Sequence, residues 1–185
     1  MNFTKHSDLE GTHALFGASK YHWINYSEDK LIEIYKNYIS VLEGTETHEF
    51  AATCIRRRQK LPSKRETLNM FVNDAIGFKM TPEQPLYFSD NFFGTADAIC
   101  FRKNQLRIHD LKTGKIPAHM EQLLIYAALF CLEYDYKPAD INIELRIYQS
   151  NDILTMNPTI EDVVPIMDKI ITFDKIIDRL KEEDL

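Results

Sequence analysis

The sequence predicts a mixed α/β domain in which a central sheet is flanked by helices. Apolar residues recur at helical spacing before residue 80 and again toward the C-terminal end. Between these regions lie short β-rich segments, and residues 141–149 alternate cleanly as a strand. The expected order is helices, three strands, helix, strand, helix. We therefore expect a helix to cross from the third strand to the fourth.

The spacing of apolar residues defines the expected helices, at about 28–43, 46–59, 63–77, 117–133 and 159–181. Ser27 is a plausible N-cap for the first of them. Gly44 is expected to end that helix, and Thr45 to cap the next. Ser63-x-x-Glu66 fits a capping box for the third helix.

Length and composition bound the class of protein. The 185 residues suit one domain, with a helical N-terminal region at about 17–80. The net charge of -6 means that any nucleic-acid site must come from a local patch or from metal ions. No apolar run approaches the roughly 18–20 residues of a membrane span, and no signal peptide is visible. The three cysteines are scattered, so we expect a reduced, cytoplasmic protein.

The stretch "LRIHDLKTGK" places an acid and a base on one face of a predicted strand. Asp110 and Lys112 alternate with the aliphatic residues that precede them. If Lys103-Asn104 forms a two-residue hairpin loop, counting back sets Asp97 opposite Asp110 and Thr95 opposite Lys112.

Two carboxylates in direct opposition would repel each other, so this register needs a compensating charge. A hard divalent cation such as Mg²⁺ or Mn²⁺ supplies it, because such ions prefer oxygen ligands. Lys112 would then reach a water or a phosphate oxygen. A lone D-x-K triplet is usually a solvated ion pair. Asp97 favours a site, because it is a carboxylate inside the apolar segment "FFGTADAICF".

Gln122 and Tyr126 are four residues apart in the expected 117–133 helix and so share one of its faces. Spacing alone favours a half-buried tyrosine with a glutamine beside it, rather than a functional pair.

These segments together resemble the PD-(D/E)XK nuclease superfamily, in its RecB-like and phage-exonuclease branch. "GTADAI", "HDLKTGK" and "QLLIYA" match G-x-x-D, (D/E)-x-K and Q-x-x-x-Y in that order. "GTETHEFA" is similar to the branch's histidine motif, and "GASKYHWIN" is similar to a group of phage and prophage proteins. The match spans about residues 17–130, and it implies that the mixed α/β domain is a restriction-endonuclease-like core.

The resemblance implies a metal site formed by His48, Asp97, Asp110 and the Leu111 carbonyl. It implies that Lys112 orients the attacking water or stabilises the transition state. It also implies that Gln122 and Tyr126 border the active site and help to hold DNA.

The activity implied by the resemblance is that of a Mg²⁺- or Mn²⁺-dependent DNA nuclease. An exonuclease of phage recombination or DNA processing is the leading expectation, acting on a duplex end or a single strand. A structure-specific or restriction-like endonuclease and a silent DNA-binding module are the alternatives. Three cysteines exclude the usual four-cysteine iron–sulfur cluster. The expected partners are DNA, further copies of the chain and a phage recombination protein, in the cytoplasm of a bacterial host.

Residues 56–65 form a basic run without an acid, made of Arg56, Arg57, Arg58, Lys60, Lys64 and Arg65. The run is interpreted equally well as a solvated surface and as a set of phosphate contacts. Glu83 is interpreted first as an exposed acid at a strand edge, with an additional metal ligand as the alternative.

Overall fold

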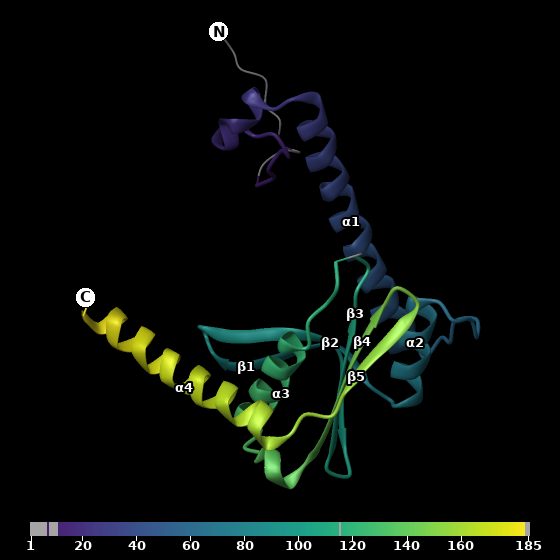
Figure 1. The fold of residues 1–185 in the computed structure, drawn as a ribbon, viewed down its shortest axis with the longest axis vertical. Helices are drawn as coiled ribbons and strands as arrows, with labels where there is room; N and C mark the ends of the chain where they lie inside the picture. The colour runs from purple at the N-terminus through teal and green to yellow at the C-terminus, as the bar shows by residue number, and fades with distance from the viewer. Residues whose placement is uncertain (1–6, 8–10, 115, 184–185) are drawn as a thin grey trace. The chain divides into compact units, whose positions relative to one another are not determined.

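A computed structural model describes residue 7 and residues 11–114 and 116–183 of the chain (Figure 1). The chain divides into two compact units, Met1–Leu42 and Glu43–Leu185.

The N-terminal unit contains the 3-10 helix η2 (Ala18–Asn25) and the first half of helix α1 (Glu28–Arg57). The backbone N–H of Lys30 donates to the Ser27 hydroxyl at 3.3 Å, which confirms Ser27 as the N-cap of α1. In η2, the Trp23 indole N–H donates to the Gly17 carbonyl at 3.1 Å.

Helix α1 runs without a break through Gly44, so the predicted helix end at Gly44 and the predicted start at Thr45 are wrong. A glycine inside a helix costs only about 1 kcal/mol relative to alanine. The second half of α1 buries Ala51, Cys54 and Ile55 in a core shared with the sheet. Tertiary packing of this face therefore outweighs the local penalty.

The second unit is built on one five-stranded sheet whose strand order is β1-β2-β3-β4-β5. The strands are β1 (Thr81–Ser89), β2 (Phe92–Arg102), β3 (Gln105–Leu111), β4 (Asn142–Gln149) and β5 (Asp152–Met156). Strands β3 and β4 are parallel, and the other neighbours are antiparallel. The parallel pair requires a crossover, which contains helix α3 (Glu121–Glu133) as predicted. The predicted mixed α/β fold is confirmed.

Helices cover both faces of the sheet and create two cores (Figure 1). On one face, α3 and α4 (Ile160–Glu183) pack around Leu106, Ile108 and Leu145. On the other face, α2 (Thr67–Gly77) and the second half of α1 pack around Leu111 and Tyr148. The short 3-10 helix η3 (Pro138–Asp140) precedes β4.

Three helix boundaries differ from the prediction. Helix α3 begins at Glu121 rather than at residue 117. Helix α4 extends to Glu183. The Ser63 capping box is absent, because α2 begins at Thr67, whose backbone N–H donates to the Asn151 side-chain oxygen at 3.0 Å.

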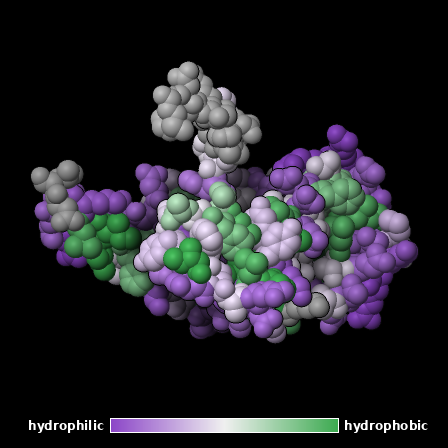
Figure 2. All heavy atoms as spheres, turned by 90° about the horizontal axis from the view of Figure 1, so that it is seen from above, coloured by the Kyte–Doolittle hydropathy of each residue, from purple (hydrophilic) through white to green (hydrophobic). Residues whose placement is uncertain are grey.

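The far end of α4 carries an exposed apolar stripe. Phe173, Ile176 and Leu180 are exposed on the last turns of this helix. Figure 2 shows hydrophobic surface on the projecting end of α4. Charged residues flank the stripe, and Lys181 Nζ donates to the Asn91 side-chain oxygen at 3.0 Å. This contact joins α4 to the β1–β2 turn.

The β2–β3 turn is the predicted two-residue loop, with φ of 50° at Lys103 and 58° at Asn104. Left-handed conformations at both positions define a type I′ turn, in which Asn-Gly is preferred. We expect the double replacement Lys103→Asn and Asn104→Gly to raise the free energy of unfolding by about 1 kcal/mol. Urea unfolding in EDTA measures this change. Lys103→Ala removes the same charge without favouring a positive φ and should not stabilise; an unchanged midpoint in the double variant would contradict this interpretation of the turn.

Candidate metal centre

The register of the β2–β3 hairpin agrees with the prediction as far as the ladder extends. Ile99 pairs with Ile108, and the last pair is Ala98 with His109. Asp97 and Asp110 occupy the next position but are not part of the ladder. Instead, Asp97 Oδ2 accepts a hydrogen bond from the Leu111 backbone N–H at 2.8 Å.

The predicted pairing of Thr95 with Lys112 is not part of the β2–β3 ladder, which ends at Ala98 and His109. On its other side, Thr95 pairs with Pro85 of β1. Lys112 lies beyond the end of β3, where its backbone N–H donates to the Tyr148 carbonyl of β4 at 2.9 Å. The parallel β4 strand, which the hairpin count left out, therefore holds the backbone at Lys112.

Strands β1 and β2 change faces at the level of Asp97. Ala96 lies in the core next to α3, whereas Ala98 lies in the core next to α2. Residues two apart in a regular strand would share a face, so the alternation is interrupted at Asp97. In β1, Glu83 falls between the pairs Pro82–Ala98 and Gln84–Ala96 and has a left-handed φ of 52°. Figure 1 shows the β1–β2 hairpin bending away from the direction of β3 and β4.

This irregularity has a cost and a consequence. A left-handed conformation is uncommon for a non-glycine residue and costs of order 1–3 kcal/mol, and such strain concentrates at functional sites. Here it accompanies the meeting of two carboxylates from neighbouring strands. The irregular position of Glu83 between two ladder pairs therefore brings its side chain next to Asp97.

Among the described residues, His48, Glu83 and Asp97 form a candidate metal-binding cluster. One potential ligand atom from each lies within 4.8 Å of the other two. His48 Nδ1 is 3.4 Å from Asp97 Oδ1. One imidazole nitrogen and two carboxylate oxygens suit Mn²⁺ well and Mg²⁺ acceptably, because both ions accept hard oxygen ligands and Mn²⁺ accepts nitrogen more readily. The residues therefore fit a divalent cation.

The electrostatics of this cluster favour a bound positive charge. The hydrogen bond to Asp97 raises the pKa of His48, although burial opposes the rise. Burial and then the negative charge of Asp97 raise the pKa of Glu83. The Asp97 carboxylate contributes to both shifts, as the largest cause for His48 and as the second cause, after burial, for Glu83.

Asp110 stands beside this cluster rather than in it. Its side chain is only 2% exposed and forms an ion pair with Lys112, whose Nζ lies 3.1 Å from Oδ1 and 3.0 Å from Oδ2. Burial raises the pKa of Asp110, the charge of Asp97 adds to the rise, and Lys112 opposes it. Of the predicted set His48, Asp97, Asp110 and Leu111, the three-residue cluster contains only His48 and Asp97.

The sequence favours an exposed acid at position Glu83 over a metal ligand, but the structure places this residue in the cluster. Glu83 does lie on an edge strand, β1, as expected, but it is not exposed there, because its side chain is partly buried beside His48 and Asp97. The register offers a signal: positions 82 and 84 of β1 pair with the two neighbours of Asp97 in β2. That signal requires the β1–β2 pairing, which hydrophobic alternation in the Pro-containing β1 segment did not reveal.

A chain of hydrogen bonds connects Lys112 to α3. Lys112 Nζ donates to Gln122 Oε1 at 2.8 Å, and Gln122 Nε2 donates to the Tyr126 hydroxyl at 3.1 Å. Gln122 and Tyr126 lie on one face of α3, as their spacing predicts. Burial raises the pKa of Tyr126, so its hydroxyl keeps its proton at neutral pH.

Gly94 of β2 makes room for the Tyr126 ring. A Cβ atom added at Gly94 would lie 2.8 Å from Tyr126 Cε1. We expect Gly94→Ala to displace the ring and to break the Gln122–Tyr126 hydrogen bond, reducing about tenfold the metal-dependent DNA cleavage that the superfamily resemblance implies. Steady-state cleavage rates measure the loss. Gly77→Ala, where an added Cβ meets nothing within 4 Å, is the matched control; equal effects of the two changes would separate Gly94 from the site.

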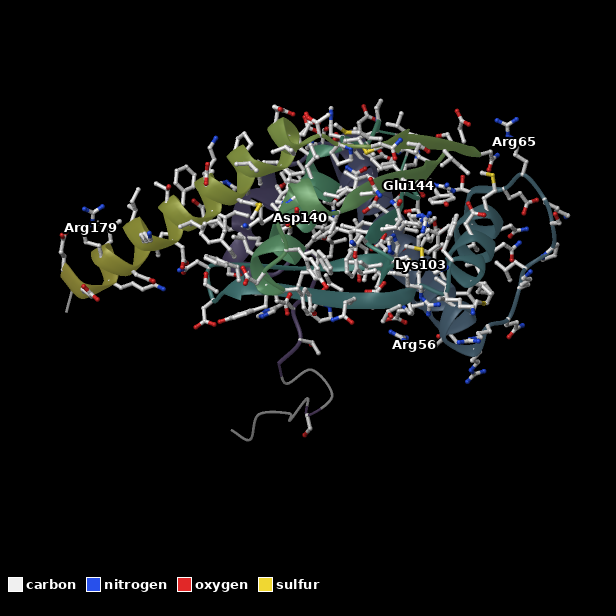
Figure 3. All side chains as sticks on the ribbon, turned by 90° about the horizontal axis from the view of Figure 1, so that it is seen from below. Arg56, Arg65, Lys103, Asp140, Glu144 and Arg179 are labelled. Carbon is white, nitrogen blue, oxygen red and sulfur yellow. The ribbon has the colours of Figure 1, made fainter. Side chains whose placement is uncertain are left out.

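The basic run divides into three parts in the structure. Lys64 and Arg65 form ion pairs with Glu66 and Asp152, at 3.9 Å and 3.3 Å. Arg56, Arg57, Arg58 and Lys60 are all exposed, and only the first of them lies against a pocket. Arg56 lines a pocket with His48 and Glu83. Figure 3 shows Arg56 and Arg65 far apart, with Arg65 projecting from the loop before α2.

Comparison with known proteins gives no match to any family model and none to a solved structure. Within the part of the chain that the structure describes, no helix combines the length and the apolar character that crossing a membrane requires.

Proposed function

We propose that the chain is a Mg²⁺- or Mn²⁺-dependent deoxyribonuclease that hydrolyses phosphodiester bonds, most simply an exonuclease of phage-type recombination or DNA processing. One observation carries the proposal. The His48, Glu83 and Asp97 cluster lies beside the buried Asp110–Lys112 ion pair, so cation ligands and a partly exposed ammonium meet at one end of the sheet.

His48, Glu83 and Asp97 would hold the cation. A bound divalent ion supplies two things to phosphodiester hydrolysis: a water of lowered pKa and compensation for charge on the phosphate. Asp97 is also fixed from the protein side, because its second oxygen accepts the Leu111 N–H. This second contact orients the carboxylate before any ligand arrives.

Besides a bound cation, the Lys112 ammonium group provides positive charge at this site. Its side chain is 31% exposed, and Asp110 and Gln122 fix its ammonium group from two directions. The ammonium can therefore donate to a water or to a phosphate oxygen without first finding its place. Gln122 and Tyr126 add polar groups next to the Lys112 ammonium group.

The test is DNA cleavage by the purified chain. Linear duplex, single-stranded and covalently closed circular DNA are incubated with Mg²⁺, Mn²⁺ or EDTA. We expect degradation of the DNA that has ends, in either metal and not in EDTA. Cleavage of closed circles would favour the endonuclease alternative. DNA that is bound but remains intact with both metals would contradict nuclease activity and favour the DNA-binding module.

A further inference from the structure

A pocket of about 430 Å³ adjoins the candidate metal-binding cluster on the side of α1. His48 and Glu83 form part of its wall, and Arg56 is its only guanidinium. The volume lies in the range of pockets that hold small organic groups.

We propose that Arg56 binds a phosphate of the DNA strand close to the bond that is cut, and that Arg57 does not. This inference rests on the proposed nuclease function and selects one residue from the basic run at 56–65.

Helical spacing places Arg56 on the side of α1 that carries His48. Positions 48, 52 and 56 are four apart and therefore lie one above another on the helix. Ala52, between them, is small and buried, so it leaves space over this part of the helix. Thr53 adds a hydroxyl to the wall. Arg57 is the next residue along the helix, about 100° further around the axis, and does not line the pocket.

The charge of Arg56 is available for a ligand. Its side chain makes no hydrogen bond or ion pair with any described residue, whereas Lys64 and Arg65 are paired with carboxylates.

Distance along the helix separates the two ends of the pocket. The eight residues from His48 to Arg56 correspond to a rise of about 12 Å. Glu49 lines the pocket near the His48 end, where a cation would bind, and Arg56 lies two turns away. A phosphate held by Arg56 is therefore not the one being cut but one near it on the same strand.

The first test compares Arg56→Gln with Arg57→Gln, which removes the same charge from the next position, also exposed but outside the pocket. Binding of a fluorescent single-stranded oligonucleotide is measured by anisotropy in EDTA, so that neither cleavage nor metal affects the result. We expect Arg56→Gln to weaken binding about 10- to 100-fold, as for loss of a charge-assisted hydrogen bond. We expect Arg57→Gln to change it less than about twofold. The salt slope should fall by about 0.7 for Arg56→Gln alone.

A second measurement identifies the phosphate. Oligonucleotides with one neutral methylphosphonate each are bound to the three proteins. Wild type and Arg57→Gln should lose affinity at one shared position, and Arg56→Gln should be indifferent there. Equal weakening by the two replacements, or the same position profile in all three proteins, would overturn the assignment of Arg56.

These results separate the inference from the proposed function. If the Arg56-specific loss occurs but wild type cleaves no DNA with Mg²⁺ or Mn²⁺, the nuclease proposal fails while Arg56 remains a phosphate ligand. If cleavage is normal and both variants bind alike, the inference fails alone.

Discussion

Replacement of Lys112 by alanine is expected to slow metal-dependent DNA cleavage by about 100- to 1000-fold, the usual cost of removing one positioned donor from a developing charge. Lys112 is suited to this role because Asp110 and Gln122 hold its ammonium group within hydrogen-bond distance. The candidate metal-binding cluster does not include Lys112, so Mn²⁺ binding should persist in Lys112→Ala.

Two measurements on Lys112→Ala decide its role. Single-turnover cleavage gives the rate, and isothermal titration with Mn²⁺ gives the affinity for the ion. Lys103→Ala, in the β2–β3 turn and labelled in Figure 3, removes a lysine outside the site and should leave both unchanged. Loss of Mn²⁺ binding in Lys112→Ala would mean that the lysine supports the structure of the centre instead of the chemistry.

Asp97→Asn is expected to remove most of the stabilisation that Mn²⁺ gives to the protein. At 100 times the dissociation constant, a ligand specific to the folded state adds about 2.7 kcal/mol. For a chain of this size, that corresponds to a rise in Tm of roughly 5–10 °C. Asp97→Asn replaces one of three clustered ligands, so we expect less than about a third of this rise.

The metal-free state supplies the control for this prediction. The amide introduced by Asp97→Asn would keep an oxygen that can accept the Leu111 N–H, although it loses the charge that faces His48. We therefore expect the Tm of Asp97→Asn in EDTA to lie within a few degrees of wild type. Asp140→Asn, an exposed acid in η3, should behave as wild type with and without Mn²⁺. An undiminished Mn²⁺ shift in Asp97→Asn would exclude Asp97 as a ligand.

The strands with clear apolar alternation and a recognisable turn could be predicted from the sequence. Alternation and the Lys103-Asn104 loop fixed the β2–β3 register through Ala98 and His109. Strand β5 was missed because it is short and mostly exposed, with little apolar alternation. Its turn, Ser150-Asn151, has φ of 51° and 60° but contains no glycine to mark it.

The candidate site was predicted in its residue types but not in its arrangement. The hairpin count that predicts Asp97, Asp110 and Lys112 requires regular strands. The interruption at Asp97 and the left-handed Glu83 depend on how β1 meets β2, and no local pattern in the sequence records it. The assignment of Arg56 by helical spacing from His48 follows from the sequence alone, because both residues lie in the helix expected at about 46–59 and are eight residues apart.

The central claim is that His48, Glu83 and Asp97 hold a divalent cation. Anomalous diffraction from crystals grown with Mn²⁺ tests it most directly. The account predicts a manganese peak within coordination distance, about 2.0–2.4 Å, of His48 Nδ1 or Nε2 and of an oxygen from each of Glu83 and Asp97. It also predicts that the peak disappears in Asp97→Asn. Crystals that contain manganese but show no peak among these three side chains would contradict the claim.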